Sequence, residues 1–203
     1  MKNIKYIFLF ILILCCFYPN VSSAQNQNIE KKYDNDEEVI LKFGYSQFLT
    51  LNDFSCYLKG GAGIQMKIDV PYKRFVFCAS ENVGFPKAKS DFILNNNTVN
   101  VNDKMEVDVA GFSTSYAILY TENLKISPLA GIGWCALSKN DNSRPKNIFT
   151  ETVGFQIESR AITLARLPLY LEYNYCFPKK YSNEIHSGMH FISIGVIMVL
   201  AWR

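Results

Sequence analysis

The residues best suited to acid–base chemistry lie together near the carboxyl end of the chain. Glu184, His186 and Ser187 supply the carboxylate, base and hydroxyl found in enzymes that transfer or remove acyl chains, and His190 follows them. Adjacent residues of a regular strand point to opposite faces, so His186 and Ser187 could not act as a pair there. The sequence therefore predicts a polar surface rim and no catalytic residues, with a lipid-modifying barrel enzyme as an alternative.

The cysteines do not have the spacing of a metal site. Beyond the first two dozen residues they stand at Cys56, Cys78, Cys135 and Cys176, which is not zinc-finger spacing, so no metal or cofactor is expected. The last three fall on expected strands that are not neighbours, whereas a disulfide needs Cα atoms within about 7 Å. We expect mostly unpaired, buried thiols, although an even number keeps an oxidised framework open.

Eight charged residues fall on the polar faces of the expected strands and are candidate interior charges. Three hypotheses compete for them: a salt-bridged plug, the lining of a small ion path, or the surface of a soluble lipocalin-like barrel that binds an apolar ligand. A barrel of eight strands is just wide enough for side chains to fill, which favours the plug. The eight are Lys42, Lys59, Lys67, Asp69, Lys125, Glu158, Arg160 and Glu172.

Strict alternation of residue types indicates the elements that must position these charges. Between Leu167 and Phe177 the odd positions are apolar and most even positions are polar, and the segment 191–202 repeats the pattern. Successive side chains of a strand point to opposite faces, so each segment has one apolar and one polar face. The polar faces mix glycines with charges of both signs, which suits a narrow lumen better than a surface in water.

Eight such segments predict an all-β fold: an eight-stranded antiparallel up-and-down transmembrane β-barrel. No periodic helical segment separates them, so a parallel sheet is not expected. The pattern changes phase near Ala110 and Gly111, which predicts a bulge there or a strand extension above the membrane over 105–109. The expected strands are 39–51, 55–70, 74–85, 105–121, 124–137, 148–163, 167–177 and 188–202.

The connections alternate in length, as they do in outer-membrane barrels, which have short periplasmic turns and longer outer loops. The even-numbered connections are tight, and only the first, near Asn52 and Asp53, breaks the alternation by being short. The long connections predict loops that could hold a surface partner, at residues 86–104, 138–147 and 178–187.

The amino terminus has the layout of a secretory signal peptide. Lys2 and Lys5 precede the apolar run Ile7–Phe17, which is well short of the roughly 20 residues of a spanning helix. Small residues then end at Ala24, where we expect cleavage. This divides the chain into a signal peptide (1–24), a flexible periplasmic tail (25–38) and an outer-membrane β-barrel domain (39–203).

The net charge gives no reason to expect a nucleic-acid partner. The whole chain carries a formal charge of +3, and removal of Lys2 and Lys5 with the signal peptide leaves 3 − 2 = +1. A nearly neutral protein lacks the electrostatic attraction that dominates binding to phosphate backbones.

Four segments in order, AGIGWCAL, TVGFQIES, LPLYLEYNY and ISIGV, resemble the closing hairpins of the small eight-stranded bacterial outer-membrane β-barrel proteins. The resemblance covers roughly residues 39–203. It implies a Gram-negative outer-membrane location, outer-membrane lipids and the outer-membrane assembly machinery as partners, and a monomer. We therefore expect a non-enzymatic outer-membrane scaffold for surface loops with a side-chain-filled lumen.

Overall fold

The computed structural model describes residues 38–50, 54–94, 97–139, 146–178 and 188–201. The predicted signal peptide (1–24) and all but the last residue of the predicted tail (25–38) lie outside the described residues. The same holds for Glu184, His186 and Ser187, for most of the expected loop 178–187, and for positions 140–145 of the loop 138–147.

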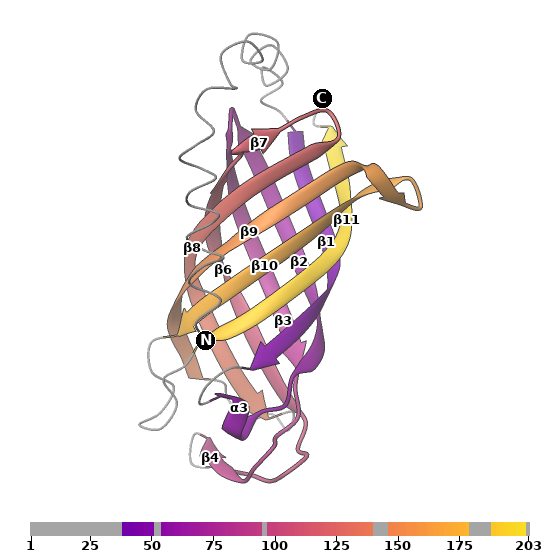
Figure 1. Ribbon diagram of the computed structural model, residues 1–203. Helices are drawn as coiled ribbons and strands as arrows, with labels where there is room; N and C mark the ends of the chain where they lie inside the picture. Colours follow the sequence, from indigo (N-terminus) through magenta and orange to yellow (C-terminus); the bar gives the residue numbers. More distant parts are fainter. Residues whose placement is uncertain (1–37, 51–53, 95–96, 140–145, 179–187, 202–203) are drawn as a thin grey trace, which may run out of the picture. The chain divides into compact units, whose positions relative to one another are not determined.

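Long antiparallel strands form a closed barrel (Figure 1). Consecutive long strands pair side by side, β1 pairs with β11, and β6 pairs with β8. This confirms the predicted eight-stranded antiparallel up-and-down barrel. The long strands are β1 (Glu38–Thr50), β2 (Gly61–Tyr72), β3 (Phe75–Phe85), β6 (Met105–Tyr116), β8 (Leu124–Lys139), β9 (Lys146–Leu164), β10 (Leu167–Pro178) and β11 (Met189–Ala201).

One end of this barrel, here called the turn end, carries the tight connections. Lys73 has a φ of 55°, and Ala165 and Arg166 have φ values of 51° and 69°. Two successive positive φ values are those of the type I′ turn, whose twist matches that of a β-hairpin. The connection between β6 and β8 is also short and contains only β7 (Leu119–Tyr120), so the expected tight turns are confirmed.

The opposite end, here called the loop end, carries the long connections. These include a short helix, α3 (Phe54–Tyr57), and a hairpin of β4 (Phe92–Leu94) and β5 (Asn97–Val99). The predicted strand 55–70 was wrong at its start, because β2 begins only at Gly61. The first connection is therefore long as well, and the alternation of short and long connections has no exception.

The apolar faces of the strands point outward. Strand β2 shows the alternation clearly, with Ile64, Met66 and Ile68 exposed while Gln65 and Lys67 are buried. This is the reverse of a soluble lipocalin-like barrel, whose apolar side chains would face inward, so that alternative was wrong. An exposed apolar belt around a closed barrel is the arrangement expected in a lipid bilayer.

The bulge expected near Ala110 and Gly111 is absent from the described strand. Strand β6 pairs in continuous register with both β3 and β8. Met105, Val107 and Val109 are buried inside the barrel, on the same face as the polar Ser115. The apparent change of phase has another cause: the lumen itself changes from polar to apolar towards the loop end.

Candidate functional site

The half of the lumen nearest the turn end is filled by a network of charged side chains. Lys42 of β1 forms an ion pair with Asp69 of β2 and lies 2.9 Å (Nζ–Oε1) from Glu158 of β9. Lys125 of β8 lies 3.0 Å from the same Glu158 oxygen. Strands that are not neighbours in the sheet are thus joined through the interior.

A second part of the network lies next to the first. Lys67 Nζ is 2.5 Å from Glu172 Oε2 and donates to Gln156 Oε1 at 2.9 Å. The other Glu172 oxygen accepts hydrogen bonds from Gln65 at 2.7 Å and Asn174 at 2.6 Å. The carboxylate is therefore satisfied on both oxygens, as a buried charge requires.

The network is electrically balanced. It holds three ammonium groups (Lys42, Lys67 and Lys125) and three carboxylates (Asp69, Glu158 and Glu172), so its formal charge is zero. These are six of the eight charges predicted for the interior. Two predictions were wrong: Lys59 lies in the first connection because β2 starts after it, and Arg160 is exposed at the turn end.

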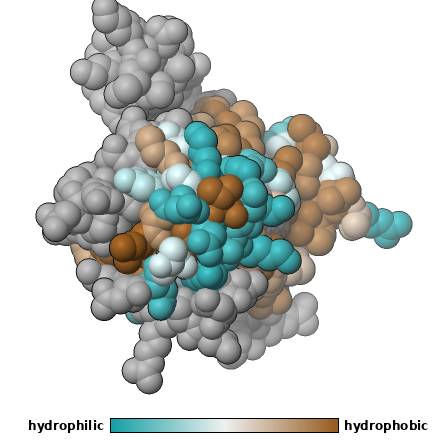
Figure 2. All heavy atoms as spheres, turned by 90° about the horizontal axis from the view of Figure 1, so that it is seen from below, coloured by the Kyte–Doolittle hydropathy of each residue, from teal (hydrophilic) through white to brown (hydrophobic). Residues whose placement is uncertain are grey.

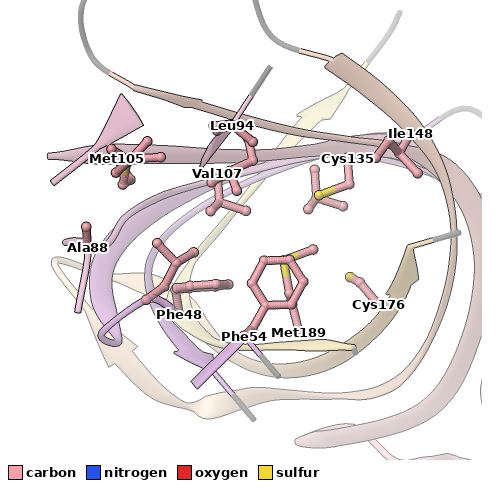
Figure 3. Packing of buried hydrophobic residues seen from close by; sticks show 14 of the residues in the cluster. Phe48, Phe54, Ala88, Leu94, Met105, Val107, Cys135, Ile148, Cys176 and Met189 are labelled. Atoms are coloured by element: carbon pink, nitrogen blue, oxygen red, sulfur yellow. The ribbon is translucent and has the colours of Figure 1, made fainter. Parts of the chain in front are cut away.

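The half of the lumen nearest the loop end is apolar (Figure 3). Phe48 of β1 and Phe191 of β11 meet with ring centroids 5.3 Å apart. The absence of a side chain at Gly84 makes room for them, since a Cβ there would lie 3.1 Å from the Phe48 Cβ. Met105, Val107, Leu137, Met189 and Cys176 belong to the same buried cluster.

A cap at the loop end closes the apolar half of the lumen. We define this loop-end cap as α3, residues 58–59 and residues 86–104, which include the β4–β5 hairpin. Phe54 and Leu58 are one helical turn apart, with the Leu58 amide donating to the Phe54 carbonyl at 2.8 Å, and both are buried. Phe92, Leu94 and Val99 of the hairpin join the same cluster. The i, i+4 spacing of Phe54 and Leu58 is a sequence signal that could have indicated the helical turn of this cap.

A small cavity lies between the two halves. The volume open to water in this cavity is about 20 Å³. Asn82 and Asn174 line it, and the side-chain oxygen of each has no hydrogen-bond partner among the described residues. A polar cavity of this volume is on the scale of one bound water.

The outer surface of the cap carries a row of lysines. The Lys59 amide donates to the Lys87 carbonyl at 2.8 Å, and Lys87 is bridged in antiparallel fashion to Lys104. All three side chains are exposed, whereas the flanking Leu58 and Ala88 are bridged to each other and buried. We call Lys59, Lys87 and Lys104 the lysine row. Figure 2 views the loop end and shows hydrophilic side chains gathered there.

His190 is the histidine that the structure describes, and it lies away from the lumen. Its Nδ1 shares a hydrogen bond with the Tyr173 hydroxyl at 2.6 Å, and its ring centroid is 4.5 Å from that of Tyr175. These partners are outward-facing residues of β10. His190 is therefore part of an aromatic cluster on the outside of the barrel.

The four cysteines among the described residues are free thiols and form no disulfide bond. Cys78, Cys135 and Cys176 are buried in the lumen, as expected, and Cys176 accepts a hydrogen bond from Thr152 at 3.6 Å. Cys56 is exposed on α3. Within the described ranges no three His, Cys, Asp or Glu side chains group as a metal site, and no helix is long and apolar enough to cross a membrane.

Comparison with solved structures finds small outer-membrane barrels. Neisserial surface protein A is 11% identical with a TM-score of 0.54, over 79% of this chain and 95% of that chain. Ail, the attachment invasion locus protein of Yersinia pestis, is 13% identical with a TM-score of 0.44, over 80% and 99%. No protein-family model and no curated protein sequence matches the chain.

These likenesses concern the fold. An Ail structure in complex with the heparin analogue sucrose octasulfate is also similar, at 13% identity and a TM-score of 0.42 over 80% of this chain and 99% of that chain. Together with the outward apolar faces and the closed antiparallel sheet, the match to Neisserial surface protein A identifies the fold as that of an eight-stranded outer-membrane β-barrel.

Proposed function

We propose that this chain, which has the fold of the small eight-stranded outer-membrane β-barrels, acts as a non-enzymatic outer-membrane scaffold. We propose further that its lumen is closed to solutes. Its outer loops bind an anionic polymer at the cell surface. The observation that carries this proposal is the lysine row, which lies on the cap of a barrel whose lumen is filled in both its charged half and its apolar half. The barrel holds the cap in place, and the cap presents the charges.

The lumen supports the scaffold function because neither half leaves room for a path. The charged half is filled by ion pairs of zero net charge, and the apolar half is packed and covered by the cap. A conducting pore would need a continuous wet passage, and the cavity between the halves is on the scale of one water. The scaffold is therefore favoured over the small ion path.

The lysine row supports binding of an anion because it opposes folding stability. Like charges placed directly opposite on paired segments are destabilising. Among the described residues, none of the three lysines forms an ion pair that would relieve this repulsion, although Lys59 Nζ donates to the neutral Asn102 Oδ1 at 2.8 Å. A polymer with regularly spaced sulfate or phosphate groups would neutralise the row.

Binding to dextran sulfate, with uncharged dextran as the matched ligand, tests this function. The purified protein should bind dextran sulfate but not dextran, and Lys87→Gln, which removes one charge of the row, should weaken binding several-fold. Lys89→Gln removes a cap charge outside the row, because Lys89 Nζ donates to the Ser55 carbonyl instead, and it should have a smaller effect. Equal loss from both variants would mean non-specific attraction, and no binding would overturn the proposal.

Recording in planar bilayers tests the closed scaffold independently. The purified protein should give no stable stepwise conductance. Steps that persist in independent preparations would overturn the closed lumen in favour of the small ion path.

The route to the membrane is part of the proposal. We propose that residues 1–24 are a signal peptide cleaved after Ala24, that 25–38 form a periplasmic tail, and that the assembly machinery inserts residues 39–203 as a monomer. Amino-terminal sequencing of the mature protein from an outer-membrane fraction should begin at Gln25. A start at Met1 would contradict the cleavage.

A further inference from the structure

The hairpin between β9 and β10 leaves the barrel wall. Residue Ser159 pairs with Leu169 but Thr163 pairs with Pro168, so residues 160–162 have no counterpart on β10. The irregularity bends the hairpin, and Figure 1 shows its tip leaning sideways from the barrel. The type I′ turn at Ala165 and Arg166 keeps the two arms together. The result is a projection from the barrel, which we call the tip (residues 160–166).

The tip exposes apolar side chains that no other part of the described protein covers. Every residue from 160 to 166 is exposed, and Ile162 and Leu164 each keep 62% of their surface accessible. An exposed apolar hairpin in water would be costly. The adjoining outer face of β10, with Leu171 at 40% exposure, faces the bilayer, so the tip continues a lipid-facing surface.

Two arginines bracket the apolar residues. Arg160 and Arg166 stand at either end of the tip, and no acidic residue lies between them. Neither forms an ion pair with a described residue. Guanidinium groups bind phosphate oxygens in a bidentate manner, and long basic side chains reach from apolar surroundings to the headgroup level.

We propose that the tip is a lipid-binding anchor in the periplasmic-side leaflet. Ile162 and Leu164 enter the upper acyl region, and Arg160 and Arg166 hold the phosphates of anionic glycerophospholipids. The site would fix the height and rotation of the barrel at its turn end. It lies at the opposite end from the lysine row and does not depend on the proposed surface binding.

The depth of the tip can be measured directly. A fluorophore is attached at Ile162→Cys in a chain whose exposed thiol is removed by Cys56→Ser. The protein is then reconstituted in phosphatidylethanolamine–phosphatidylglycerol vesicles with brominated acyl chains. Bromine should quench the fluorophore and aqueous iodide should not. Quenching by iodide alone would overturn the anchor, and a fluorescence change caused only by peptidoglycan fragments would replace lipid with a cell-wall partner.

Headgroup selectivity tests the arginines. In native mass spectrometry from mixed micelles, the protein should retain phosphatidylglycerol several-fold over phosphatidylcholine. Arg160→Gln/Arg166→Gln should abolish this preference, whereas Lys89→Gln, which removes a charge at the loop end, should preserve it. An unchanged preference in the arginine variant would overturn their role. Heat-modifiable migration on a gel shows that each variant has folded.

Discussion

Lys67 of β2 and Glu172 of β10 meet across the lumen, with the ammonium nitrogen 2.5 Å from a carboxylate oxygen. Strands β1 and β11 separate the two in the sheet, and 105 positions separate them in sequence. The pair therefore ties together opposite parts of the wall. It can form only when the barrel has closed in the correct register.

Removing one member of this pair should cost more than removing both. Lys67→Met leaves the buried Glu172 carboxylate uncompensated, which typically costs about 3–5 kcal/mol of unfolding free energy. Lys67→Met/Glu172→Gln removes both charges and keeps most of the side-chain volume, so it should recover more than half of that loss. Urea unfolding in detergent micelles measures both values.

The matched control for this pair is Lys59→Met, a lysine on the exposed cap. It should change the unfolding free energy by less than about 1 kcal/mol, as surface changes usually do. Glu172→Gln, measured in the same way, completes the cycle. If the loss in the double variant equals the summed losses of Lys67→Met and Glu172→Gln, the two charges do not interact in the folded protein.

The cap should open when its central side chain is truncated. Phe54 is fully buried against the apolar half of the lumen, and Phe→Ala changes in cores cost about 3–5 kcal/mol. Maleimide should label only Cys56 in the parent mature chain, because Cys78, Cys135 and Cys176 are buried. In Phe54→Ala, the rates at Cys135 and Cys176 should rise, since both belong to the cluster under the cap.

Cys78 serves as the internal control for cap opening. It lies in the polar half of the lumen, beside Asp69 in register, so opening of the cap alone should leave its labelling slow. Ser55→Ala on the same helix should leave all three rates low. Equal acceleration of all three buried thiols would show unfolding of the whole barrel rather than opening of the cap.

Local patterns explain why the barrel was predictable. In a strand, alternate residues point to opposite faces, so the alternation of apolar and polar residues gives the direction of each side chain. The faces of β2, β9 and β10 could therefore be assigned before any strand pairing was known. The same rule failed at residues 55–60, where one helical turn mimics alternation and placed Lys59 in the lumen. The rule also suggested a bulge in β6. It assigns apolar residues to the outer face, but near the loop end the lumen is apolar, so the apolar residues of β6 there face inward.

The cap and the ion-pair partners were beyond local patterns. Phe92, Leu94 and Val99 lie in a stretch that reads as polar, and their burial depends on a barrel mouth formed by distant strands. Likewise, the sequence predicted Lys42, Glu158 and Lys125 as interior charges but could not pair them, because their contacts depend on barrel closure.

A basic residue on the outer face at mid-strand should impair assembly. Leu171 is 40% exposed and points outward, and an arginine facing lipid near the bilayer centre costs about 2–4 kcal/mol. Leu171→Arg should lower folding yield in vesicles, measured by heat-modifiable migration. Asn147→Arg, an exposed position at the loop end of β9, should fold normally. Asn174→Arg, on the inner face of the same strand, would not serve as a control because Asn174 is buried in the lumen. Equal folding yields for Leu171→Arg and Asn147→Arg would contradict the membrane position of Leu171.

The β5–β6 connection should loosen in acid. Asp103 accepts hydrogen bonds from the Asn100 amide at 2.8 Å and from Lys139 of β8 at 2.9 Å. First the amide and then the lysine hold the pKa of Asp103 below its ordinary value of 3.8. The stabilisation is therefore complete above pH 3.8 and is lost as the pH falls through the lowered pKa.

Hydrogen exchange at the Asn100 amide measures this contribution. The exchange rate of Asp103→Asn is compared with that of the parent protein at each pH, which cancels the intrinsic pH dependence of amide exchange. The parent should be better protected at pH 6, and the difference should vanish at strongly acidic pH because the parent carboxyl is then neutral. Glu151→Gln, an exposed residue of β9, should match the parent throughout. A difference that stays constant with pH would mean that the Asp103 charge does not stabilise the connection.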